Sequence, residues 1–418
     1  MKHIYLTLIM LLLPILASAQ QKQIFIPDTL KSVDFNNPQS QWSWSHSAQT
    51  ENIVCFWQRD FGFNPYSAPE LDGHKMSFDL GNLQVRLESF YRFFRDSLKF
   101  TLPGSIADKY KMMVMIDYSL EGTAYGGTYD DFIGALWVSP LRIQDKKLNC
   151  LAHELGHSFQ LQIMADKTGE AWCGSGFFEM TSQWMLWLVN PHWLTDENYH
   201  FEAFRKLTHK GFLHLDNIYH SPYVIEWWAE KYGISSIADL YREGKEGEDP
   251  AMTYMRHNGL SQSQFCDDMF LCYQHLLNFD FRHARQETRP YALTFSTPMD
   301  TLANGWMSPD TACVPENYGF NAIKLSVPAP GKKVTAQFQS LAQKNKTAGH
   351  RYAFVAVTTD DESIYGQPAQ SPKGKITFIA PNDKSLKALY LLVMGAPTTH
   401  DMDPSSRTFP YKVKVVSK

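Results

Sequence analysis

Two histidines four positions apart, in the stretch CLAHELGHSFQLQI at residues 150–163, form the pattern with the clearest chemistry. On a helix, His153 and His157 lie one turn apart on the same face, so both imidazoles could bind one metal ion. Glu154 is displaced by about 100° around the helix, where it could reach a water molecule on that metal. Zinc suits this set because it accepts neutral imidazole and lowers the pKa of its water. The pattern predicts a Zn²⁺ site with Glu154 as general base.

A third ligand is expected shortly downstream, and Glu179 is the best candidate. Between residues 171 and 191 it is the only acidic or basic side chain in a largely apolar segment that must be buried. A carboxylate buried there without a partner would be costly, whereas zinc would satisfy it. Asp166 and Glu170 are alternatives. Gln183, one turn after Glu179, could hydrogen-bond to a ligand.

The elements that must position these residues change in character near residue 148. Before it, an amphipathic helix at 80–98 lies between strand-like runs at 52–57, 111–117 and 132–139. After it the pattern is helical, with helices predicted at 148–164, 176–190, 198–209, 222–232, 235–243 and 260–279. Beyond Pro290, short runs of period two alternate with Pro, Gly, Asn and Asp turns, which is typical of a β-sandwich.

These patterns predict the α+β class, with strands followed by a mainly helical part and a C-terminal all-β sandwich. We expect a signal peptide at 1–19 and an N-terminal α/β part with an edge strand at 20–147. A helical part at 148–285 would carry the histidines and Glu179. An accessory sandwich at 295–418 would bind glycans, hold the substrate or simply pack on the rest.

The first residues have the composition of a secretory signal peptide. Lys2 and His3 precede an apolar run, and Ala17-Ser18-Ala19 is a small-residue cleavage signal. We therefore expect export to the periplasm, cell surface or medium after cleavage near Ala19. No later stretch is apolar enough for membrane insertion of the mature chain. The formal charge of −4 and the pI near 6.4 do not indicate a nucleic-acid partner.

Six cysteines permit disulfides in an oxidising compartment, but their spacing does not define a connectivity. Cys150 lies one turn before His153. It could pair with Cys173 and join the two ligand helices, it could bind the metal, or it could be a free buried thiol.

The order of a strand, a helix with His153-Glu154-Leu155-Gly156-His157 and a helix with Glu179 resembles the gluzincin zinc metallopeptidases. The spacing to the glutamate is short, as in their enhancin- and mucinase-like branch. This resemblance covers roughly residues 110–280 and implies a zincin-like body. It also implies that both histidines and Glu179 bind zinc and that Glu154 is the base. The chain further resembles a poorly characterised group of secreted bacterial proteins in WSWSHSAQTEN at 42–52, YGFNAI at 318–323 and LLVMGAPT at 391–398.

The resemblance also implies a tyrosine or histidine that stabilises the oxyanion of the tetrahedral intermediate. The stretch NIYHSPYVIEWW at 217–228 is a loop that enters a helix, and it offers His220 and Tyr223. Tyr125, in a glycine-rich loop, is a third candidate. Each of them could equally be an ordinary buried aromatic or capping residue.

Together these features predict a secreted zinc-dependent peptidase that hydrolyses an extended peptide or glycoprotein through a zinc-activated water. Strand 132–139 is expected to pair with the substrate, because Gly134 and Ala135 offer little obstruction at an edge. The main alternative is a non-catalytic exported protein that uses the zincin scaffold to bind protein or glycan. A third possibility is hydrolysis of a non-peptide amide in the cell envelope.

Overall fold

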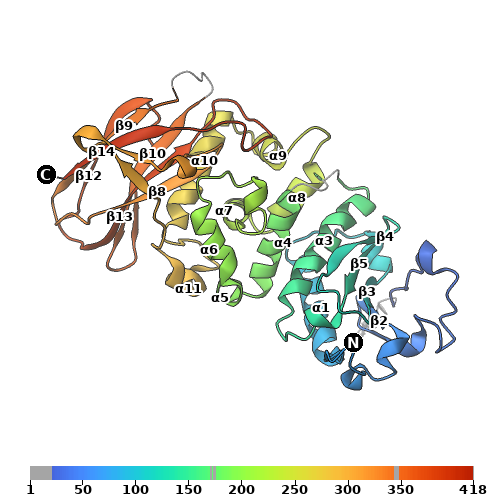
Figure 1. Ribbon diagram of the computed structural model, residues 1–418. Helices are drawn as coiled ribbons and strands as arrows, with labels where there is room; N and C mark the ends of the chain where they lie inside the picture. The colour runs from blue at the N-terminus through green and yellow to red at the C-terminus, as the bar shows by residue number, and fades with distance from the viewer. Residues whose placement is uncertain (1–20, 170–171, 173–175, 343–347, 418) are drawn as a thin grey trace, which may run out of the picture.

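The computed structural model of the protein describes residues 21–169, 172, 176–342 and 348–417, so the expected signal peptide at 1–19 lies outside the described residues. The molecule is elongated, with a sheet-and-helix part, a helical part and a β-sandwich in sequence order (Figure 1). The α+β class predicted from the sequence is confirmed. In the described part, every helix is too short or too polar to cross a bilayer.

A five-stranded sheet with the order β1-β2-β3-β5-β4 forms the first part. Its central strands β2, β3 and β5 are parallel, and β1 and β4 pair antiparallel at the two edges. The continuous apolar runs of β2 and β3 suit strands that are covered on both faces. The bounds are β1 (Ser47–Gln49), β2 (Ile53–Trp57), β3 (Met112–Ile116), β4 (Tyr125–Tyr129) and β5 (Ile133–Val138).

The edge of this sheet differs from the prediction. The predicted edge strand at 132–139 is β5, which lies between β3 and β4. The glycine-rich stretch before it, predicted as a loop, forms β4 and occupies the edge. The assignment of 132–139 as the substrate-pairing edge is therefore wrong. The sequence YGGTY lacks the apolar alternation that marks a half-buried strand, so the pattern did not reveal β4.

Helices α1 and α3 pack beside the sheet, and α3 leads into the helical part. The longer helices lie within a few residues of their predicted bounds, whereas α9 was not predicted. Pro250 marks its start, because Pro fits the first turn and Asp249 caps the helix through Met252 N. The bounds are α1 (Leu80–Asp96), α2 (Ile106–Lys109), α3 (Asn149–Ala165), α4 (Gly176–Val189), α5 (Trp193–Asp196), α6 (Asn198–Lys206), α7 (Tyr223–Tyr232), α8 (Ser236–Glu243), α9 (Pro250–His257), α10 (Gln262–Leu276) and α11 (Arg285–Thr288).

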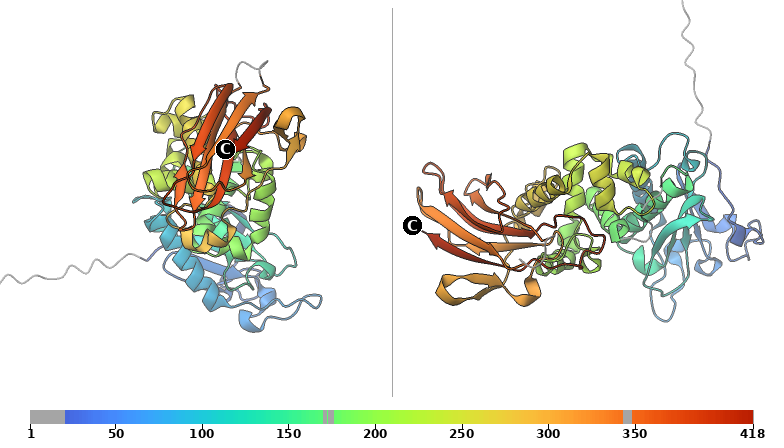
Figure 2. Two further views of the ribbon diagram at one scale, coloured as in Figure 1. Left: turned by 90° about the vertical axis from the view of Figure 1, so that its left-hand side faces the viewer. Right: turned by 90° about the horizontal axis from the view of Figure 1, so that it is seen from above.

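The sandwich consists of an inner sheet, β11-β10-β13-β8, and an outer sheet, β12-β9-β14-β7-β6. Strand β10 is buried along its whole length because α10 covers one face and the outer sheet the other. Strand β9 alternates between buried and more exposed positions, so the outer sheet presents one face to solvent (Figure 2). The bounds are β6 (Met299–Thr301), β7 (Met307–Pro309), β8 (Phe320–Leu325), β9 (Lys333–Ser340), β10 (His350–Thr358), β11 (Ser363–Tyr365), β12 (Lys373–Ile379), β13 (Leu386–Gly395) and β14 (Tyr411–Ser417).

Candidate metal centre

Helices α3 and α4 pack side by side, and this contact brings the predicted ligands together. A methyl group at Gly156 would lie 2.7 Å from Oγ of Ser182 and 3.3 Å from its Cα, so the glycine allows the helices to approach closely. Leu155 and Phe159 are fully buried and hold α3 in the core.

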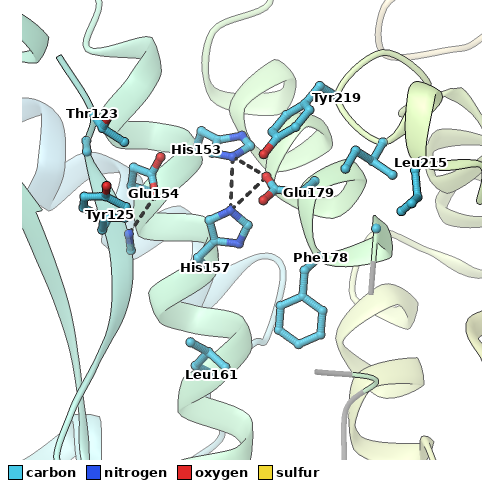
Figure 3. Close-up of a pocket in the computed structure, with 14 residues that line it drawn as sticks. Thr123, Tyr125, His153, Glu154, His157, Leu161, Phe178, Glu179, Leu215 and Tyr219 are labelled. Carbon is cyan, nitrogen blue, oxygen red and sulfur yellow. Dashed lines mark hydrogen bonds and ion pairs between the residues drawn. The ribbon is translucent and has the colours of Figure 1, made fainter. Parts of the chain in front are cut away.

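The side chains of His153, His157 and Glu179 converge on one point (Figure 3). Oε2 of Glu179 lies 3.0 Å from Nε2 of His153 and 3.2 Å from Nε2 of His157. The two Nε2 atoms are 3.1 Å apart. The three side chains line a pocket of about 510 Å³, which Glu154, Tyr125 and Tyr219 also line.

Two glutamine side chains determine which nitrogen of each ring carries a proton. Gln160 donates its amide to the carbonyl of Phe178, so its Oε1, 2.9 Å from Nδ1 of His157, can only accept. Gln183 donates to the carbonyl of Tyr219, and its Oε1 lies 3.2 Å from Nδ1 of His153. Both Nδ1 atoms are therefore the donors. In the neutral rings, both Nε2 atoms present lone pairs to the carboxylate.

This arrangement fits a bound cation. Three acceptor atoms that face one another at about 3 Å are unfavourable without a positive charge between them. Protons on both Nε2 atoms would instead set two positive rings side by side, with those atoms 3.1 Å apart. Two imidazole nitrogens and one carboxylate oxygen are the donor set of a catalytic zinc site with an open fourth position. Gln160 and Gln183 supply the hydrogen bonds that orient such ligands.

The two partly buried carboxylates have shifted pKa values. Burial alone would raise the pKa of Glu179, but in a metal-free chain the interaction with His153 and His157, when protons occupy their Nε2 atoms, outweighs burial and holds this pKa well below its usual range. Burial lowers the pKa of His157, yet the hydrogen bond and charge of Glu179 raise it overall. The pKa of Glu154 is raised, chiefly by burial. Glu179 therefore has a lower pKa than Glu154 and stays ionised to a lower pH.

Glu154 faces the same pocket from the side of β4. Its Oε2 accepts a hydrogen bond of 2.7 Å from the backbone N–H of Gly126, on the edge strand. A Cβ at Gly126 would come within 1.8 Å of the carbonyl oxygen of Glu154. Only glycine lets β4 approach α3 this closely, and the approach holds the carboxylate beside the histidines.

Of the predicted oxyanion donors, Tyr223 is not brought to this pocket. It is 1% exposed, its ring packs against Trp187, Phe204 and Phe279, and its hydroxyl has no hydrogen-bond partner in the described part of the chain. Burial raises its pKa well above the usual value. The prediction that Tyr223 is an oxyanion donor is therefore wrong. Tyr223 begins α7, and its side chain points into the core.

His220 also lies outside the residues that line the pocket, and its Nδ1 is 2.7 Å from Nδ1 of His200. Tyr125 lies on the rim, with its hydroxyl 3.3 Å from Glu121. Tyr219, which the sequence did not single out, lines the pocket instead. Its ring stacks on His153 at 6.2 Å, and burial together with the charge of Glu179 raises its pKa to about 12. Nothing in the loop sequence distinguishes Tyr219 from Tyr223, because the turn into α7 decides which of them faces the pocket.

The other ligand candidates have different surroundings. Asp166 accepts hydrogen bonds from Oγ of Ser105 and N of Ile106, so it caps α2 and does not reach the histidines. Glu170 lies outside the described residues, and so does Cys173, the predicted partner of Cys150. Cys150 carries a free thiol whose pKa burial raises to about 12.

The cleft continues on the other side of the cluster. A second pocket of about 260 Å³ shares His153, Glu154 and Tyr219 with the first. It is polar, and Arg142 and Glu197 line it. The first pocket has an apolar wall formed by Leu161, Phe178, Leu215 and Ile218. A ligand that spans both pockets would cross the histidines at its middle.

The model of a family described as "Family of unknown function (DUF6055)" matches residues 16–417. No curated protein matches the sequence. Among solved structures, the CBM22-1 xylan-binding domain from Paenibacillus barcinonensis Xyn10C is 9% identical, with 29% of this chain and 96% of that chain covered and a TM-score of 0.17. The GH115 4-O-methyl-alpha-glucuronidase BtGH115A is 8% identical, with 64% and 39% covered and a TM-score of 0.16. Scores this low do not establish a shared fold.

Proposed function

We propose that the protein, which belongs to the family of unknown function (DUF6055), is an exported zinc-dependent peptidase with a gluzincin-like centre. The observation that carries this proposal is the convergence of two Nε2 lone pairs, from His153 and His157, on Oε2 of Glu179. Export rests on the signal peptide predicted at residues 1–19.

His153, His157 and Glu179 would hold the zinc ion, which when bound supplies Lewis-acid polarisation of a carbonyl and acidifies water. Glu154 takes the proton from the attacking water and later delivers it to the leaving amine. Its carboxylate suits this task, because burial raises its pKa and the N–H of Gly126 fixes its position.

The substrate would be an extended peptide or glycoprotein segment. Strand β4 is the sheet edge beside the cluster, and the N–H of Gly126 on this strand donates to Glu154, which lines the same pocket. An extended chain can pair with such an edge and cross the histidines between the apolar and polar pockets. Tyr219, which lines the opposite wall of this pocket, would donate a hydrogen bond to the oxyanion.

Cleavage profiling tests this proposal. The zinc-loaded protein is incubated with a peptide library and with intact glycoproteins, and new termini are identified by mass spectrometry. We expect cleavage by the wild type and none by Glu154→Gln, which retains the metal. Cleavage by Glu154→Gln at the wild-type rate would refute the role of Glu154. Zinc binding without cleavage of any substrate would instead favour the non-catalytic binding protein.

A further inference from the structure

The charge of the molecule is unevenly distributed between the sandwich and the rest. Residues 295–418 contain 14 lysines and arginines against 9 aspartates and glutamates, a formal charge of +5. The rest of the chain contains 25 against 34, a formal charge of −9. The total of −4 conceals this asymmetry. A positive domain on a negative body is an electrostatic feature that a partner can recognise.

The lysines of the sandwich are ordered on its outer sheet. Lys373 of β12 pairs in register with Gln339 of β9, which pairs with Lys412 of β14. Two residues further along, Lys375 pairs with Gln337, which pairs with Lys414. Residues opposite each other on neighbouring strands share a face, so both rows point the same way. We call the six residues of these two rows the lysine face.

The rows lie on the solvent side of the sheet. Val334 and Phe338, which alternate with the row residues along β9, are buried in the core between the sheets. Lys373 and Lys375 are exposed, and Lys412 and Lys414 are partly exposed. Strand spacing places the lysines of one row about 10 Å apart and the two rows about 7 Å apart. The result is a grid of four positive charges on the outer sheet, at the end of the molecule far from the candidate metal centre (Figures 1 and 2).

Within the described residues, the four lysines of this face have no acidic partner. Lys412 lies over the ring of Trp306 at 4.9 Å, and Lys414 donates to the backbone carbonyl of Asn304. The five strands of the outer sheet contain a single acid, Asp300 on the edge strand β6. Elsewhere in the described sandwich, Lys384 is ion-paired with Glu362 and Lys387 with Asp361, whereas Lys324, Lys332 and Lys333 form no ion pair. Four of the unpaired cations of the sandwich therefore lie together on this face.

From this grid we propose that the lysine face binds an acidic polysaccharide, a polymer whose carboxylate or sulfate groups recur along the chain. Several separated charges suit a polyanion better than one small anion. The amides of Gln337 and Gln339 between the lysines can bond to sugar hydroxyls. Nucleic-acid-binding sheets expose aromatic rings on which bases stack, and no outward residue of the two rows is aromatic. This site is independent of the proposed peptidase centre.

Affinity electrophoresis of the full chain tests the proposal. The gels contain polygalacturonate, dextran sulfate or neutral dextran at low ionic strength. We expect retardation by at least one polyanion, none by neutral dextran, and weaker retardation in salt because screening acts on exposed charges. Lack of retardation by both polyanions would overturn the proposal.

Matched variants locate the site. Lys373→Gln/Lys375→Gln should weaken binding about 5-fold, and the same change in all four lysines about 30-fold. Lys384→Gln/Lys387→Gln alters the charge of the sandwich as much as the first double variant, but should leave affinity within about 2-fold. Melting temperatures confirm that all variants are folded. Equal losses in the two double variants would overturn the proposal, and so would tighter binding of a DNA duplex or of phosphatidylserine vesicles at the same salt.

Discussion

Nε2 of His153 lies 3.0 Å from Oε2 of Glu179, although the two residues are 26 positions apart in the sequence. The first comes from α3 and the second from α4, and the packing of Gly156 against Ser182 sets the distance between these helices. The carboxylate is the only charge on α4 and is partly buried, so the lack of a partner would disfavour it. The helix pair therefore brings this carboxylate against the two imidazole rings.

Removal of Glu179 should remove the metal. We expect about one zinc ion per wild-type chain and almost none in Glu179→Ala, because two imidazoles alone bind weakly. Elemental analysis after dialysis measures this, and zinc should raise the melting temperature of the wild type only. Glu154→Gln is the matched control and should keep its zinc. Unchanged stoichiometry in Glu179→Ala would exclude Glu179 as a ligand.

Gln160 should position His157 without touching the metal. Gln160→Met removes the acceptor for Nδ1 and should lower zinc affinity by about 10- to 100-fold, as measured by chelator competition. Gln162→Met makes the same change on the same helix, where the amide bonds to Gly134 and the carbonyl of Phe132. We expect this control to lower stability and leave zinc affinity unaltered. Equal zinc affinity in the two variants would contradict the positioning role.

Tyr219 and Tyr223 form a natural pair for testing the oxyanion donor. Tyr219→Phe should lower kcat by about 100- to 1000-fold at constant zinc content, because one donor to the oxyanion is lost. Tyr223→Phe should keep near-normal turnover, since its hydroxyl is buried without a partner. Steady-state kinetics on a peptide found by profiling distinguishes the two. Full activity in Tyr219→Phe would exclude Tyr219 as the oxyanion donor and leave His220 and Tyr125 as candidates.

Gly126 should tolerate no side chain. In Gly126→Ala the new Cβ would meet the carbonyl oxygen of Glu154 at 1.8 Å, so β4 must move away from α3. We expect a loss of about 1–3 kcal/mol in the free energy of unfolding and a marked loss of turnover. Gly122→Ala, where a Cβ meets nothing within 4 Å, is the control and should behave like the wild type. Chemical denaturation and kinetics together measure both effects.

The sandwich should lose stability in acid through His350. Burial lowers the pKa of this histidine to about 4 in the folded chain, and its Nε2 lies 3.1 Å from the carbonyl oxygen of Phe409. In the unfolded chain His350 binds its proton near pH 6.5. The contribution of the neutral ring to the free energy of unfolding is therefore fully present above that pH, and it is lost as the pH falls towards 4. The loss should reach about 3 kcal/mol at low pH. Urea denaturation of His350→Gln, which cannot titrate, should show a correspondingly smaller decrease over this range.

The sequence by itself determined the local parts of the site. Backbone geometry places residues four apart on one helix face, so the relation between His153 and His157 follows from their spacing alone. Glu179 was identifiable because a single charge in an apolar helix requires a partner. The long helices and most strands were likewise predictable from periodicity, which reflects the face that each element buries.

The tertiary structure alone decided the features that depend on how helices, strands and loops pack against one another. It put β4 rather than β5 at the sheet edge, turned Tyr219 to the pocket and Tyr223 to the core, and oriented the amides of Gln160 and Gln183. It also aligned lysines 39 positions apart in the sequence into rows, through the register of β9 with its neighbours. Strand order, register and loop direction arise from packing between distant segments, and the composition of one segment does not encode them.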